Sequence, residues 1–146
     1  MPQVLAGLLS MDDIALHAIT QGEVYLSSSS GGTWSPGSWI DLPVTIVVDD
    51  VPEGAKALCL FQSSMRANSY GQRFYLRCVV DGAPQLESTM STEGEDVGQY
   101  QASVCFALVS GLSVGKHTFK IQAMCDSSTT SSYWRNLRHV VAIMKR

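Results

Sequence analysis

The feature that most constrains the fold is a period-two alternation of apolar and polar residues near the end of the chain. In residues 116–125 the apolar side chains on one face of an extended chain are Phe119, Ile121, Ala123 and Cys125. Residues 137–146 repeat the pattern with Leu137, Val141 and Ile143. Alternation of this kind is typical of a half-buried β-strand. We therefore predict a strand, an exposed polar loop and a closing strand that together form a final hairpin.

Length and composition favour one all-β domain. A chain of 146 residues buries roughly 68–70% of its unfolded surface on folding, which is enough for a hydrophobic core without disulfides or metal ions. Only 16% of the residues are charged, and 12 glycines separate short apolar runs, which favours strands and turns. We predict strands starting near residues 23, 42, 56, 72, 86, 100, 116 and 137. These eight strands indicate a single jelly roll or β-sandwich over residues 22–146.

Three local patterns refine this prediction. Residues 56–65 are apolar on both faces, which marks a central strand. In residues 100–109 we expect Val104, Phe106 and Leu108 to point inward. Asp81-Gly82 is a strong signal for a two-residue hairpin turn.

Residues 1–21 differ from the rest and form a predicted N-terminal arm. The segment 10–13 resembles a capping box, so one or two helical turns are expected. A helix this short is not stable alone. The arm therefore packs either on its own domain or on a partner. Its candidate contact residues are Leu5, Leu8, Leu9, Ile14 and Leu16.

The charge is divided unevenly along the chain. Residues 1–55 hold seven acidic residues and no Lys or Arg, whereas residues 56–146 hold ten basic and six acidic residues, so the net charges are −7 and +4. We expect the two halves to attract each other, within one domain or between subunits. No basic cluster with interleaved aromatic residues appears, so nucleic-acid binding is not predicted.

The four cysteines show neither metal-ligand spacing nor a CxxC motif. Each lies in an apolar run, so we expect buried, reduced thiols and no metal site. No signal peptide is recognisable, and we expect folding in a host cytoplasm without a membrane partner.

No catalytic motif is recognisable in the sequence. The three histidines, His17, His117 and His139, lack the orienting partners that general base catalysis requires, so we interpret them as structural. We predict a protein that is not an enzyme and has no cofactor and no small-molecule substrate.

Aromatic residues beside turns and polar runs are the remaining candidates for binding. Trp34 and Trp39 bracket a Pro-Gly turn, and Tyr133, Trp134 and Arg135 follow six consecutive Ser and Thr residues. Two interpretations stay open. The aromatic rings either cover the ends of the sandwich or form a recognition surface with Arg135 as an anchor.

Four segments, residues 51–60, 74–82, 111–122 and 137–143, resemble the tail-fibre, head-fibre and capsid-decoration proteins of tailed bacteriophages. The resemblance covers about residues 42–146. It implies a jelly roll of the tumour-necrosis-factor and C1q shape that forms a homotrimer. The chain lacks the coiled-coil heptads, the collagen-like repeat and the second domain of fibre proteins, so it is more similar to a capsid cement protein.

The resemblance implies a structural protein that binds the major capsid protein lattice on the outside of a virion. The alternative is a receptor- or glycan-binding tip of a tail or head fibre, with Trp34, Trp39, Tyr133 and Trp134 as its contact patch.

Overall fold

The computed structural model describes residues 20–26, 30–32, 37–66, 72–86, 90–93, 99–126 and 132–144. For residues 20–26, 30–32, 90–93, 132 and 133, only the backbone is described. Nearly all of the predicted arm, together with Trp34, lies outside these ranges. β1 begins at Thr20, so the last two residues assigned to the arm belong to the first strand.

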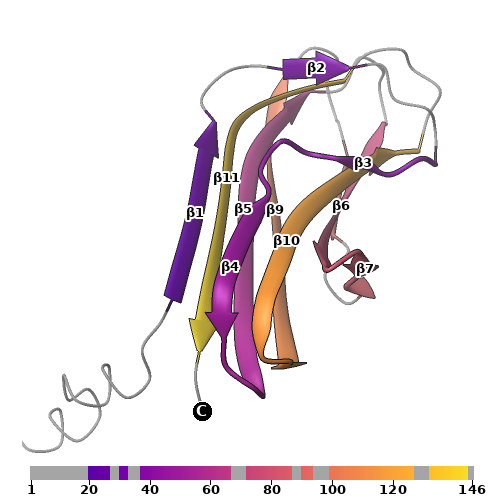
Figure 1. Cartoon of the computed structure of the whole chain (residues 1–146). Helices are drawn as coiled ribbons and strands as arrows, with labels where there is room; N and C mark the ends of the chain where they lie inside the picture. The colour runs from indigo at the N-terminus through magenta and orange to yellow at the C-terminus, as the bar shows by residue number, and fades with distance from the viewer. Residues whose placement is uncertain are drawn as a thin grey trace, which may run out of the picture.

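The described chain is a sandwich of two antiparallel sheets (Figure 1). Sheet A has the order β1-β11-β5-β9, and β2 pairs with β11. Its strands are β1 (Thr20–Leu26), β2 (Ser30–Gly32), β5 (Ala55–Arg66), β9 (Tyr100–Leu112) and β11 (Ser132–Met144). Sheet B has the order β3-β10-β6-β7, with β4 beside β10 and β8 beside β6. Its strands are β3 (Ile40–Asp41), β4 (Ile46–Val51), β6 (Arg73–Val80), β7 (Ala83–Pro84), β8 (Met90–Glu93) and β10 (Gly115–Cys125).

The all-β prediction is confirmed. The eight strands of four or more residues correspond to the eight predicted ones, and β2, β3 and β7 are short additions within the described chain. β5 lies between β11 and β9, as its two apolar faces predict. No helix of the described residues is long and apolar enough to span a bilayer.

The predicted final hairpin is wrong. β10 belongs to sheet B and β11 to sheet A, so the chain changes sheets between Cys125 and Ser132. The alternation did identify the buried faces, because Phe119, Ile121, Val141 and Ile143 are all at most 1% exposed. Period two fixes which side of a strand is buried, but it carries no information about the neighbouring strand.

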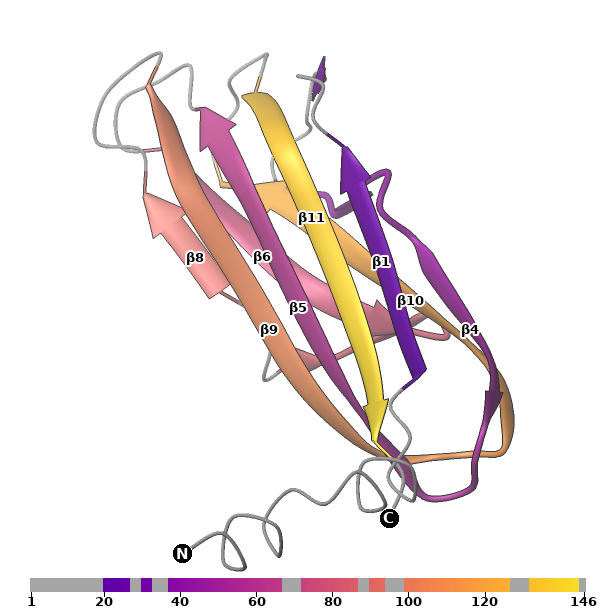
Figure 2. The ribbon, with the colours of Figure 1, turned by 90° about the vertical axis from the view of Figure 1, so that its left-hand side faces the viewer.

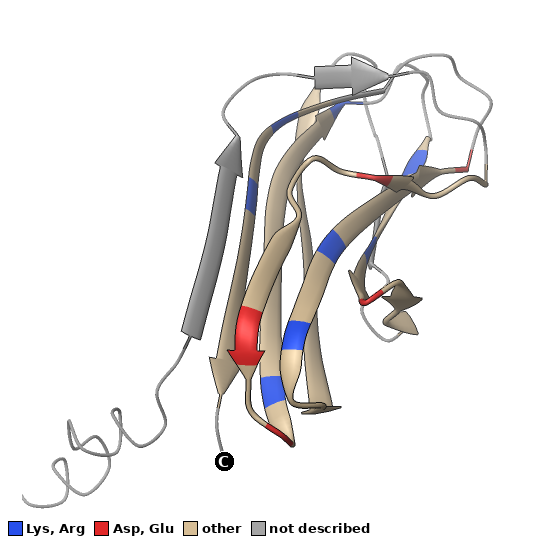
Figure 3. Cartoon of the chain, viewed as in Figure 1, with Lys and Arg blue, Asp and Glu red and all other residues tan. Residues whose placement is uncertain are grey.

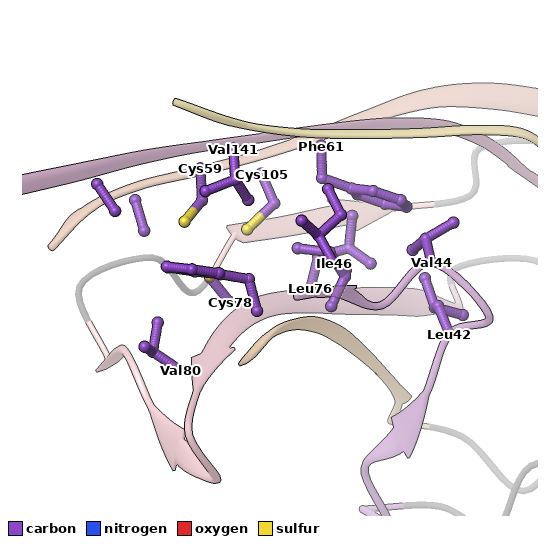
Figure 4. Close-up of a cluster of buried hydrophobic side chains, with 14 of the residues drawn as sticks. Leu42, Val44, Ile46, Cys59, Phe61, Leu76, Cys78, Val80, Cys105 and Val141 are labelled. Atoms are coloured by element: carbon purple, nitrogen blue, oxygen red, sulfur yellow. The ribbon is translucent and has the colours of Figure 1, made fainter. Parts of the chain in front are cut away.

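The core fills the space between the sheets (Figure 4). Phe61 of sheet A and Phe119 of sheet B are the largest fully buried side chains. Burying each contributes roughly 1.5–3 kcal/mol relative to exposure. All four cysteines are buried free thiols, as predicted. The hydrogen bond with Cys78, together with burial, raises the pKa of the Cys59 thiol.

One two-residue turn and two ion pairs stabilise the outside of sheet B. Asp81 and Gly82, with φ of 50° and 83°, connect β6 to β7 in register, as predicted for this dipeptide. Lys116 and Asp49 form an ion pair of 3.1 Å, and Lys120 and Asp41 form one of 2.7 Å. Each pair joins an acid of the first 55 residues to a base of the remainder, so the charge asymmetry is at least partly satisfied within the domain (Figure 3).

The prediction for the faces of β9 is wrong. Cys105 and Ala107 point into the core, whereas Val104, Phe106 and Leu108 are 52%, 54% and 59% exposed. Cys105 lies opposite Phe61 in the register of β5 and β9, so a small side chain accompanies a large one on the inner face. Because both faces of β9 are apolar, alternation alone did not distinguish them.

Candidate functional site

The outer surface of sheet A carries a continuous set of apolar side chains, here called the apolar face. It spans the three strands β11, β5 and β9, which lie side by side (Figure 2). Its members are Leu58, Leu60, Val104, Phe106, Leu108, Val140 and Ala142.

Strand register brings these residues together in rows. Val140 lies opposite Leu60, and Leu60 lies opposite Phe106. In the next row Ala142 lies opposite Leu58, and Leu58 lies opposite Leu108. Directly opposed side chains in antiparallel strands are about 4.5–5.5 Å apart at their Cβ atoms. The rows therefore form one surface, and Leu60, Val104, Phe106 and Leu108 are each 44% to 59% exposed on it.

An open depression of about 430 Å³ adjoins the apolar face. Leu60, Val104 and Val140 line its apolar side, and Gln62 and Arg138 line its polar side. Gln62 lies opposite both Arg138 and Val104 in the register. The apolar face thus changes into a polar border along β5.

Arg135 marks the same border farther along β11. Its guanidinium carbon lies 3.7 Å from the centroid of the Tyr100 ring, and that of Arg66 lies 5.7 Å from the same centroid. Cation–π contacts of this kind contribute about 0.5–1 kcal/mol at exposed sites. Arg135 is therefore positioned on the outside of sheet A, where a partner can reach it.

Trp134 corrects part of the predicted contact patch. It is only 7% exposed and belongs to the core, whereas its neighbour Arg135 is exposed. Successive residues of a strand point to opposite faces, so the two side chains cannot serve one surface. The interpretation in which the indole covers the sandwich is the correct one for Trp134.

A second group of side chains lies on the outer surface of sheet B and is here called the Trp39 cluster. Its members are Trp39, Asp41, Arg77, Lys120 and Gln122. Gln122 of β10 lies opposite Arg77 of β6 on one side and opposite Asp41 of β3 on the other. Trp39 is half-buried, and the guanidinium carbon of Arg77 lies 4.0 Å from the centroid of the Trp39 ring.

Hydrogen bonds connect the polar members of the Trp39 cluster. Arg77 Nε donates to Gln122 Oε1 at 2.9 Å, and Gln122 Nε2 donates to Asp41 Oδ1 at 2.8 Å. Lys120 Nζ donates to Asp41 Oδ2 at 2.7 Å. The hydrogen bonds from Lys120 and then Gln122 lower the pKa of Asp41, and burial lowers the pKa of Arg77.

The described histidines occupy two different environments. His117 is 5% exposed, with Nδ1 2.6 Å from Asp81 Oδ2 and Nε2 2.9 Å from the Ser113 carbonyl oxygen. Both partners are acceptors, so both ring nitrogens donate only in the charged imidazolium. The contact with Ser113 and then that with Asp81 raise the pKa of His117 against the opposing effect of burial.

His139 is fully buried in the core and lies 2.7 Å, through Nδ1, from the Val44 carbonyl oxygen. Its Nε2 has no hydrogen-bond partner within the described residues. Burial lowers the pKa of His139, although the Val44 carbonyl opposes the shift. The neutral ring therefore donates from Nδ1.

The structure places the sequence-predicted residues unevenly. Trp39 is on sheet B and Arg135 on sheet A, so these two do not form one patch. Tyr133 is described only in its backbone, and six candidates lie outside the described residues: Leu5, Leu8, Leu9, Ile14, Leu16 and Trp34. No group of three His, Cys, Asp or Glu side chains in the described ranges is placed to hold a metal ion.

Sequence reasoning missed the apolar face and the partners of Trp39. Residues 56–65 are apolar on both faces, and residues 100–109 share this pattern. The second apolar face of these two strands was the signal for the exposed apolar face. Arg77 and Gln122 gave no signal, because only strand register places them beside Trp39.

No protein-family model matches the sequence, and no curated protein matches it. Among solved structures, the chain is similar to VP2 of infectious bursal disease virus in a subviral particle. The TM-score is 0.57 at 10% identity, over 87% of this chain and 33% of the VP2 chain. The structure of T=1 particles derived from the same virus gives a TM-score of 0.56 at 10% identity, over 87% of this chain and 32% of that chain. The carbohydrate-binding module CBM36, in complex with calcium and xylotriose, gives a TM-score of 0.43 at 10% identity, over 84% of this chain and 98% of the module. This TM-score is too low to support an inference.

The chain spans about a third of the VP2 chains that it matches. At such low identity the similarity establishes the fold. The protein is a jelly-roll β-sandwich of the kind found in viral capsid proteins.

Proposed function

We propose that the chain is a structural protein of a virion, which forms a homotrimer through the apolar face and decorates the outside of a capsid shell. The observation that carries this proposal is the apolar face itself. Phe106 and Leu108 are more than half exposed on β9, the edge strand of sheet A beside β5. Contiguous exposed apolar surface of this kind marks an interaction site on a soluble protein.

A second copy of the chain is the occupant that fits this face. Homomeric interfaces are more apolar than the rest of a protein surface, with aromatic and Arg residues enriched. The apolar face combines aliphatic side chains and Phe106 with Arg135 and Arg138 at its border. The resemblance to phage fibre and decoration proteins supports a threefold arrangement.

The energy available from this face is of the right order for self-association. Full burial of a Leu, Val or Phe side chain contributes about 1.5–3 kcal/mol, so burying the exposed half contributes about 1 kcal/mol. Leu60, Val104, Phe106 and Leu108 are each about half exposed. Together they supply about 4 kcal/mol per subunit, to which the border residues add.

Attachment to the shell is assigned to the arm and to neighbouring aromatic residues. The arm carries Leu5, Leu8, Leu9, Ile14 and Leu16 and precedes β1, which lies at the edge of sheet A. Trp34 and Tyr133 are further candidates for contact with the major capsid protein lattice. A protein that binds only the assembled shell stabilises it by mass action.

The test has two parts. Light scattering after size exclusion should give a mass three times the 15.8 kDa of the chain, and the protein should sediment with assembled shells of the proposed partner, the major capsid protein. A variant lacking residues 1–19 retains β1 and should remain trimeric but no longer sediment with shells. A monomeric full-length chain would overturn the trimer, and undiminished shell binding by the truncated variant would overturn the role of the arm.

A further inference from the structure

We propose that the Trp39 cluster binds an acidic carbohydrate, with Arg77 holding the sugar carboxylate, Asp41 and Gln122 bonding its hydroxyl groups, and Trp39 forming an apolar wall. This site lies on sheet B, on the opposite side of the sandwich from the apolar face. It therefore does not depend on trimer formation.

Arg77 is the central group because its position is fixed while no carboxylate of the described residues pairs with its charge. The guanidinium is oriented by its Nε bond to Gln122 and by stacking on Trp39 at 4.0 Å. Within the described residues Arg77 forms no ion pair, in contrast to Lys116 and Lys120. A partly buried cation without a counter-anion is unfavourable. Its terminal N–H groups form a planar fork that matches a carboxylate in a bidentate arrangement.

Asp41 supplies the complementary chemistry on the other side of Gln122. Both of its carboxylate oxygens accept one hydrogen bond, from Gln122 and from Lys120, and each oxygen retains acceptor capacity for a hydroxyl donor. Its side chain is 44% exposed, so a ligand can reach it. Because Gln122 bonds both Arg77 and Asp41, the cation and the anion are held in a fixed relation across β6, β10 and β3.

The presence of both charges discriminates between ligand classes. An acidic peptide would satisfy Arg77 with a carboxylate, but it lacks the ring of hydroxyl donors that the free acceptor positions of Asp41 can bind. A neutral sugar would satisfy Asp41 and leave Arg77 uncompensated. An acidic sugar offers one carboxylate and several hydroxyl groups on a ring with an apolar face, and it satisfies all four side chains. Aromatic rings beside a few convergent polar groups are typical of small-ligand sites.

The test compares two sugars that differ only at one carbon. Methyl β-D-glucuronide carries a carboxylate where methyl β-D-glucoside carries a hydroxymethyl group. Titration of the ¹⁵N-labelled full-length chain, monitored by NMR, reports directly on the Trp39 indole N–H, the Arg77 Nε–H and the Gln122 amide. An array of glucuronate-, galacturonate- and sialate-containing glycans, with neutral ones alongside, tests the sugar class more broadly.

Three variants identify the side chain responsible. Arg77→Gln removes the charge, and Arg77→Lys retains the charge without the fork. Lys116→Gln is the matched control, because it removes one positive charge from an exposed position of the same strand as Lys120. Folding of each variant is checked by the dispersion of its amide spectrum.

We expect glycans with a carboxylate to bind and to shift the three reporter signals. Both Arg77 variants should weaken binding by about ten- to hundredfold, the scale of a charge-assisted hydrogen bond, and Lys116→Gln should bind as the wild type does. The proposal is overturned if neutral and acidic sugars bind equally, if no acidic glycan binds, or if folded Arg77→Gln retains wild-type affinity. Preferential binding of an acidic peptide would also overturn the proposal.

Discussion

Replacing Phe106 by glutamate should dissociate the trimer and leave the protomer folded. Phe106 is 54% exposed on the outer surface of sheet A and lies opposite Leu60, so the core does not depend on its full side chain. In an interface the replacement loses about 1 kcal/mol of apolar burial and adds the desolvation of a carboxylate, at least about 3 kcal/mol. A loss of about 4 kcal/mol corresponds to roughly thousandfold weaker association.

Sedimentation velocity over a concentration series measures this effect. The wild type should sediment as a trimer at micromolar concentration, and Phe106→Glu should sediment as a monomer with an unchanged thermal unfolding midpoint. Val47→Glu is the matched control, because Val47 is 50% exposed but lies on β4 of sheet B. A Phe106→Glu variant that stays trimeric, or a Val47→Glu variant that dissociates equally, would refute the assignment of the interface to the apolar face.

Three further predictions concern stability. Phe119→Ala should lower the free energy of unfolding by about 3–5 kcal/mol, since Phe119 is fully buried; chemical denaturation measures this, and a loss below about 1 kcal/mol would contradict the core assignment. The raised pKa of His117 predicts that its contribution to the free energy of unfolding is complete below pH ~6.5, the ordinary pKa of histidine. This contribution is lost as the pH rises through the pKa of the folded state. Denaturation curves at several pH values measure this dependence, and Asp81→Asn should flatten it. The lowered pKa of His139 predicts a separate loss of stability as the pH falls from ~6.5 through the folded pKa, which His139→Gln should remove.

Much of the architecture followed from residue alternation. The number of longer strands, the buried faces of β10 and β11, the central position of β5 and the Asp81-Gly82 turn were all predicted correctly. These features are local, because a strand that is polar on one side has only one stable orientation toward a core. The same local logic indicated that the cysteines are buried.

The errors arose where a local pattern was ambiguous or silent. β9 is apolar on both faces, so its orientation depended on which side chains fitted opposite Phe61. Trp134 and Arg135 are adjacent in sequence but point to opposite sides of sheet A. The sites themselves depend on pairing between distant strands, as when Gln122 joins Arg77 and Asp41 across intervals of 45 and 81 residues.

The sequence by itself determined an all-β jelly roll with apolar strand faces, because burial of alternating side chains is a property of each strand. Only the tertiary structure decided that β10 and β11 lie in opposite sheets, that the larger side chains of β9 face outward and that Arg77 stacks on Trp39. The physical reason is that strand pairing and the filling of the core are settled jointly by all segments, so the surfaces left exposed for partners emerge only when the whole sandwich is packed.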